Sequence, residues 1–188
     1  MRRLNNITVE YSFYLFAAIF LLLIPLRLAL AWVIAVIIHE FCHYLALRAC
    51  RVSIISASIS AAGIKMETEL MTVRQEFICA LSGPAGGFFV LIFARWLPCT
   101  AVCAFIHSLF NLLPVYPLDG GRALRCLLYK LFGDQHGEKL CAWAGYAFSA
   151  MLVISAIVLS LRFNMGILPA VLLILFFGKI KLANSGNK

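Results

Sequence analysis

Three polar residues interrupt an otherwise apolar stretch in the order His39-Glu40-Phe41-Cys42-His43. At about 3.6 residues per turn, the two histidines lie on one helix face, one turn apart. Two imidazoles so placed can bind one Zn²⁺, and the glutamate beside them is then set to act as a general base. Ionisable groups inside a bilayer cost about 2.5–3.5 kcal/mol each on insertion scales, so they usually have a function. The alternative is a set of hydrogen-bonded core residues without a ligand.

A catalytic zinc also needs a third protein ligand and an open position. We expect Asp119 to be that ligand, because only Asp119 and Glu40, of the eight carboxylates, lie within or at the end of an apolar stretch. Asp119 follows a proline-interrupted segment and precedes Gly120-Gly121, which allows a close backbone approach. His107 either lines the same site or packs between helices, and His136 is expected to be solvated in a polar loop at residues 133–137.

The amino-acid composition indicates that these residues lie in a membrane protein. Of the 188 residues, 63% are hydrophobic and 13% are charged, against about 45–50% and about 25% in an average globular domain. A soluble domain of this length cannot bury so much apolar surface, which excludes a soluble enzyme, a disordered tail, a coiled coil and a disulfide-stapled secreted domain. The net charge of +8 comes from short basic pieces between apolar stretches, which fits membrane topology and not nucleic-acid binding. The seven cysteines form no CxxC pair, and we interpret them as small buried hydrophobes.

We therefore predict an all-α polytopic membrane protein with about six transmembrane helices. Residues 11–47 must form two spans, because one helix of that length would be about 55 Å long against a hydrocarbon core of about 30 Å. Pro114 and Pro117 should kink or unwind the end of the fourth span. Residues 1–182 are expected to form a single domain, with a short polar tail at 183–188. The predicted spans are 11–26, 28–47, 77–96, 99–118, 141–161 and 165–180.

Two segments have alternative interpretations. Residues 50–72 alternate partly between polar and apolar side chains around Ala61-Ala62-Gly63, which predicts a small β-hairpin at the membrane surface between spans two and three. The alternative is an irregular polar loop. At the start, Ala29-Leu30-Ala31 resembles a signal-peptide cleavage site, but apolar sequence resumes at Trp32, which favours a span that is retained.

The His-Glu-x-x-His motif occurs together with Asn-x-x-Pro-x-x-Pro-Leu-Asp-Gly-Gly at residues 111–121. This pair of motifs resembles the site-2 protease family of intramembrane zinc metalloproteases. The six-span layout and short length resemble its stage IV sporulation protein FB branch. The resemblance covers roughly residues 1–180 and implies one zinc per chain, bound by His39, His43 and Asp119, with Glu40 as the base. It also implies hydrolysis of a peptide bond in or near a transmembrane segment of a membrane-associated protein, in that branch a sigma-factor precursor.

The sequence departs from the family pattern in two places. The family often has a Gly-Pro-x-x-Asn motif in its third span, and here Gly87 stands where the asparagine is expected. A role of that asparagine in contacting substrate therefore does not carry over. The sporulation branch often has a nucleotide-sensing CBS domain at its C-terminus, whereas this sequence ends in a short basic tail from Lys179.

A substrate helix must become extended before cleavage, because its backbone carbonyls are shielded within the helix. The predicted hairpin offers an edge that can pair with such a segment by β-augmentation. Asn111 is expected to contact the substrate backbone or the oxyanion, or else to stabilise the kink. Two alternative functions are a zinc transporter and a catalytically inactive protein that holds a membrane partner. The sequence leaves open the oligomeric state and the existence of an inhibitory membrane partner.

Basic residues predict the orientation. Of the 16 Lys and Arg residues, all except Arg27, Arg95 and Arg162 fall on the side of the predicted membrane that carries both termini. Positively charged loops stay in the cytoplasm, so both termini and the active site are expected there, in a bacterial cell membrane.

Overall fold

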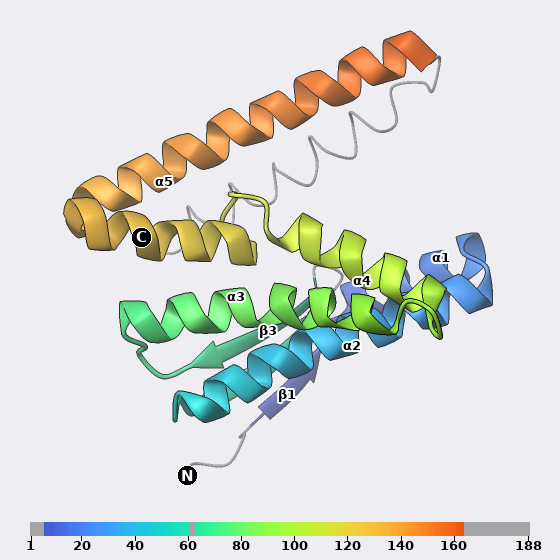
Figure 1. The fold of residues 1–188 in the computed structure, drawn as a ribbon, viewed down its shortest axis with the longest axis horizontal. Helices are drawn as coiled ribbons and strands as arrows, with labels where there is room; N and C mark the ends of the chain where they lie inside the picture. Colours follow the sequence, from blue (N-terminus) through green and yellow to red (C-terminus); the bar gives the residue numbers. More distant parts are fainter. Residues whose placement is uncertain (1–5, 61–62, 164–188) are drawn as a thin grey trace. The chain divides into compact units, whose positions relative to one another are not determined.

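The structure, a computed structural model, describes residues 6–60 and 63–163, which are mostly helical and carry one small sheet (Figure 1). The described chain falls into two compact units that divide between Leu112 and Leu113. The strands are β1 (Asn6–Val9), β2 (Ile54–Ser60) and β3 (Gly63–Thr68), and the helices are α1 (Tyr11–Leu23), α2 (Leu26–Ala49), α3 (Val73–Val90), α4 (Pro98–Asn111) and α5 (Asp119–Phe163), with a 3₁₀ turn η1 (Leu91–Phe93) after α3.

In the first unit, α2, α3 and α4 pack side by side and alternate in direction (Figure 1). The core between them is built mainly from small residues, Ala35, Ala101 and Ala104, together with Val90. Small side chains let helix backbones approach closely. Such close packing drives helix association in a membrane, because lipid is as apolar as the side chains and the hydrophobic effect does not bring helices together there. Because α2 and α4 run in the same direction, their C-terminal ends lie at the same end of this three-helix bundle (Figure 1).

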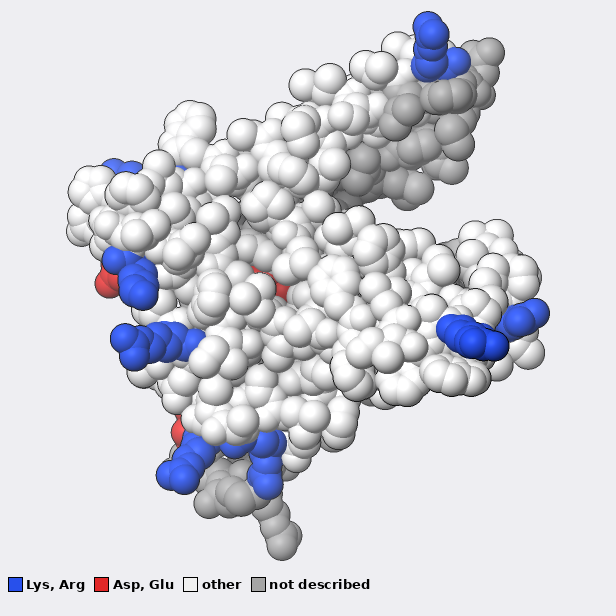
Figure 2. Space-filling view, in the orientation of Figure 1, with Lys and Arg blue, Asp and Glu red and all other residues white. Residues whose placement is uncertain are grey.

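By length and composition, three of the described helices are able to cross a membrane: Leu26–Ala49, Val73–Phe93 and Asp119–Arg162. Helices α1 and α4 are apolar but shorter. Figure 2 shows uncharged side chains along the helices and Lys and Arg gathered near helix ends, as expected of surfaces that face lipid. Six spans were predicted, and the sixth, 165–180, lies outside the described residues. The fourth span was predicted to run to 118 with a kinked or unwound end. Helix α4 ends at Asn111 and residues 112–118 are not helical, so the unwinding is confirmed.

The predicted hairpin is confirmed, since β2 and β3 pair antiparallel with Ala57 opposite Met66. A third strand was not predicted: β1 pairs parallel with β2, so that β2 lies between β1 and β3. Ser56 donates a hydrogen bond of 2.7 Å to Glu67 across the hairpin, and Lys65 lies 3.6 Å from the same carboxylate. Both interactions lower the pKa of Glu67, the hydrogen bond more than the charge. Because β2 lies in the middle of the sheet, β3 is an edge strand among the described strands, and it carries the ionised carboxylate of Glu67.

The connection from the sheet into α3 is fixed by a capping box. Thr72 accepts a hydrogen bond from the Gln75 backbone, and the Gln75 side chain accepts one from the Thr72 backbone. The same glutamine side chain donates a hydrogen bond of 3.1 Å to the Cys50 carbonyl at the end of α2. The Gln75 side chain therefore caps the N-terminus of α3 and links it by a hydrogen bond to the end of α2.

In the second unit, α5 bends at Gly133, whose φ of +75° breaks the helix. Its two arms run antiparallel and meet through small residues spaced by four: Gly137 against Leu128 and Tyr129, and Cys141 against the Gly121 carbonyl at 3.7 Å. Such spacing lets the arms approach closely. The predicted loop at 133–137 is therefore wrong apart from the single break at Gly133, although His136 is exposed as expected.

Candidate metal centre

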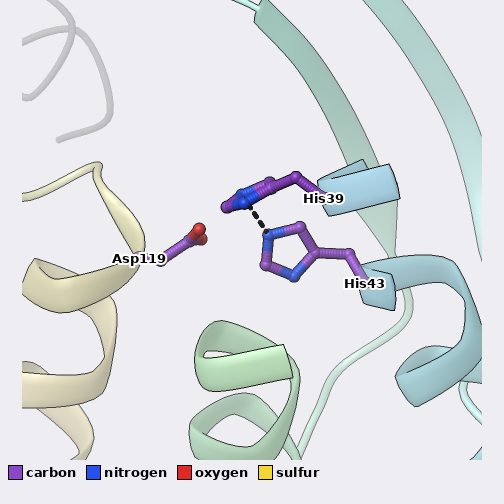
Figure 3. A group of neighbouring side chains, drawn as sticks. All are labelled: His39, His43 and Asp119. Atoms are coloured by element: carbon purple, nitrogen blue, oxygen red, sulfur yellow. Dashed lines mark hydrogen bonds between the residues drawn. The ribbon is translucent and has the colours of Figure 1, made fainter. Parts of the chain in front are cut away.

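The two histidines of α2 meet as their spacing predicts. His39 and His43 are both buried, and their Nε2 atoms lie 3.1 Å apart. The rings are 4.8 Å apart at 80°, so the two nitrogens face the same point from different directions (Figure 3). A tetrahedral zinc with Zn–N distances of about 2.0–2.1 Å separates two ligand nitrogens by roughly 3.3 Å. The observed spacing therefore suits two ligands of one ion.

The tautomer of His43 is set by its other ring nitrogen. Nδ1 lies 2.7 Å from the backbone carbonyl oxygen of Cys79 in α3, and a carbonyl can only accept. Nδ1 therefore carries the hydrogen, and the lone pair of Nε2 is left to face His39. Ser82 donates to the same carbonyl at 2.7 Å and helps to fix it. A backbone partner on the outer nitrogen is the usual way in which a protein orients a metal-binding histidine.

Gly83 leaves the space in front of the two histidines open. A Cβ atom at residue 83 would lie 2.3 Å from the Nε2 atom of His43 and 2.7 Å from that of His39. A single methyl group at residue 83 would thus stand within 2.7 Å of both Nε2 atoms. Within the first unit, the glycine, the paired nitrogens and the fixed tautomer fit a bound metal ion.

Other glycines of α3 serve packing. At Gly86, a Cβ atom would lie 2.2 Å from the Cys42 Sγ atom, so this cysteine packs against α3 one turn beyond Gly83. At Gly87, which replaces the expected asparagine, a Cβ atom would lie 1.8 Å from the Ser108 Oγ atom of α4. The fully buried Ser108 side chain therefore fills the space that a longer residue at 87 would need.

His107 is the residue that sequence reasoning placed least well. Its ring lies 4.6 Å from the His39 ring, edge to face at 80°, and 5.7 Å from the Trp32 ring. His107 thus lines the histidine pair and also packs between α2 and α4, so the two alternatives are not exclusive. The available signal was its four-residue spacing from Asn111, which puts both polar side chains on one face of α4.

Asn111 is held by His107. Its amide nitrogen donates to the His107 backbone carbonyl at 3.0 Å and lies 3.2 Å from the ring Nε2 atom. The carbonyl can only accept, which fixes the nitrogen end of the amide toward His107. One amide hydrogen of Asn111 is therefore used by the His107 carbonyl, and the amide oxygen, an acceptor, is at the other end of the group.

Glu40 and Asp119 occupy different elements. Glu40 is the half-buried residue next to His39 in α2. Asp119 belongs to the second unit, where it is buried and is the first residue of α5, 3.7 Å from the Arg122 guanidinium. A helix N-terminus favours a negative charge. Gly121 permits this start, because a Cβ atom there would lie 2.3 Å from the Tyr116 backbone nitrogen.

Comparison with known proteins adds two findings. Residues 92–155 match the family model of Peptidase family M50. The matched segment contains Asn111 and Asp119 and lies outside the His39–His43 motif, so the two motifs are independent observations. A search of curated proteins finds no match.

Among solved structures, the fold is similar to that of the site-2 protease from Methanocaldococcus jannaschii. The TM-score is 0.66 at 19% sequence identity, and the similarity covers 93% of this chain and 89% of that chain. The apolar helices and the two similarities together support an integral membrane protein with a metalloprotease-like fold.

Proposed function

We propose that this chain is an intramembrane zinc metalloprotease that hydrolyses a peptide bond in or near a transmembrane segment of a membrane-associated protein. The observation that carries the proposal is the pair of buried imidazoles in an apolar helix, with Nε2 atoms 3.1 Å apart and Gly83 before them. The match to Peptidase family M50 and the site-2 protease fold support it.

One zinc per chain would be bound by His39, His43 and Asp119, each of which offers one donor atom of a kind that zinc accepts (Figure 3). When bound, the ion supplies Lewis-acid polarisation of the scissile carbonyl. Two neutral imidazoles and one carboxylate leave a fourth position open, as a catalytic zinc site requires.

Glu40 acts as the general base in this proposal. It takes a proton from the attacking water and passes that proton to the leaving amine, which is the role of a glutamate beside paired histidine ligands. Asn111 binds the substrate backbone. Its amide is anchored to the His107 carbonyl by one hydrogen, so it can offer Oδ1 to a substrate N–H or its second amide hydrogen to the oxyanion.

Strand β3 receives the substrate as an extended strand. β1 covers the outer edge of β2, which leaves β3 as the available edge of the hairpin among the described strands. Main-chain pairing there provides affinity without demanding a particular side-chain sequence. The active site and both termini face the cytoplasm in this proposal. A sigma-factor precursor is one candidate substrate, and it rests on the resemblance to the sporulation branch alone.

The experiment that tests the proposal is reconstitution of the purified protein in liposomes with a pool of tagged single-span proteins. New N-termini identified by mass spectrometry should require both zinc and Glu40. Zinc uptake into the liposomes without any new N-terminus would instead favour a transporter.

A further inference from the structure

The segment that leads into Asp119 is held by an aromatic and cationic cluster in the second unit. Residues 112–118 form no regular helix, and Tyr116 lies at their centre. The guanidinium carbon of Arg125, in the first arm of α5, lies 4.7 Å from the centroid of the Tyr116 ring. This is a cation–π distance, at which a planar guanidinium is attracted to the ring face.

The same arginine also lies near a second aromatic ring. Its guanidinium carbon lies 5.8 Å from the ring centroid of Tyr129, one turn further along α5. The Tyr129 hydroxyl donates a hydrogen bond to Glu138, which belongs to the second arm beyond the bend at Gly133. Arg125 therefore links the loop segment, the first arm and the second arm through two aromatic rings.

Tyr116 is coupled mechanically to Asp119. The Leu118 amide donates to the Val115 carbonyl at 2.9 Å, and the Arg122 amide donates to the Leu118 carbonyl at 2.9 Å. Gly121 lies directly against the backbone of Tyr116. A displacement of the Tyr116 backbone would therefore shift the first turn of α5, which carries Asp119.

We propose that Arg125 is a positioning residue for the metal ligand Asp119 and acts through the Tyr116 ring. This inference rests on the proposed function, since it presumes that Asp119 binds zinc. Arg125 touches neither the metal nor the substrate in this account. It fixes the direction from which the carboxylate approaches, as outer residues do around other metal sites.

The test measures the zinc affinity of the purified full chain in detergent, by competition with a chelator of known affinity. Arg125→Met keeps the apolar stem and removes the guanidinium, and Tyr116→Leu removes the ring without changing any charge. Each should weaken zinc binding about tenfold, within the range of outer-shell changes. Lys130→Met removes an exposed basic side chain from the same arm and should leave the zinc affinity unchanged.

A double-mutant cycle separates positioning from general loosening of the fold. In an Asp119→Ala background, Arg125→Met should change the zinc affinity less than twofold, because the group that it orients is gone. The visible spectrum of bound Co²⁺, which reports the ligand set, should change alike in Arg125→Met and Tyr116→Leu. An equal loss of affinity with and without Asp119, or no loss in either variant, overturns the inference. A wild-type chain that binds no zinc overturns the proposed function as well.

Discussion

The Nε2 atoms of His39 and His43 lie 3.1 Å apart and point at the same space. The backbone of Gly83 borders that space, and the Cys79 carbonyl keeps the hydrogen of His43 on the outer nitrogen. At 3.1 Å the two nitrogens are within hydrogen-bond distance of each other, so a shared proton or a bound cation would stabilise the pair. Any side chain at residue 83 would enter the space beside both nitrogens.

Gly83→Ala should abolish zinc binding, because the new methyl group would occupy the space in front of both nitrogens. Gly86→Ala is the matched control. Its methyl group would press on Cys42 in the same helix interface, at an overpacking cost of about 1–3 kcal/mol, without approaching the histidines. Metal analysis and thermal unfolding of both variants decide the point. Equal zinc content in the two variants would contradict the assignment.

His39→Ala and His43→Ala should each lose the metal, whereas Cys42→Ser should keep it. The reason is that Cys42 packs against Gly86 and not toward Gly83. Zinc per chain is measured on protein purified without added metal. Full zinc retention in the double histidine variant, or loss of zinc in Cys42→Ser, would show that the ligands are assigned wrongly.

Asp119→Asn should lower the zinc affinity by more than the roughly 10–100-fold that outer-shell changes cost, because the ligand loses its charge. Chelator competition gives the number. Arg122→Gln is an informative companion, since its guanidinium lies 3.7 Å from the same carboxylate and competes with a metal for it. Its removal should leave zinc bound or strengthen it. Weaker binding in Arg122→Gln than in Asp119→Asn would refute the ligand role of Asp119.

The side on which the hairpin lies tests the proposed orientation. In a background with the seven cysteines replaced, Leu70→Cys marks the end of the sheet and Trp96→Cys marks the connection between α3 and α4. Both positions are exposed. An impermeant thiol reagent added to intact cells should label Trp96→Cys only, and Leu70→Cys only after lysis. The reversed pattern would place the active site on the outer face.

The sequence was sufficient wherever a short-range pattern determines structure. The four-residue spacing of His39 and His43 fixes their common helix face, and the prolines after Asn111 predict where α4 unwinds. The hairpin followed from alternation around Gly63. Each of these features depends on residues close in the chain, so periodicity and backbone restriction are enough to find them.

The features that the sequence missed depend on distant partners. Strand β1 has only four residues and exists because it pairs with β2, some fifty positions later. The polar residues around His136 predicted a loop, whereas this segment is helical. Its small residues Gly137 and Cys141 pack on the other arm of α5, which the local sequence does not show. His107 was ambiguous because only the packing of α4 on α2 brings it to His39.

The most direct test of the central claim compares the wild-type chain with Glu40→Gln in liposomes that contain tagged single-span proteins. Glutamine keeps the shape of the side chain but cannot take a proton, so zinc content and thermal stability should be unchanged. The wild-type protein should generate new N-termini in or near the spanning segments, and Glu40→Gln should generate none. Cleavage by Glu40→Gln at the wild-type rate would contradict the proposed mechanism at its centre.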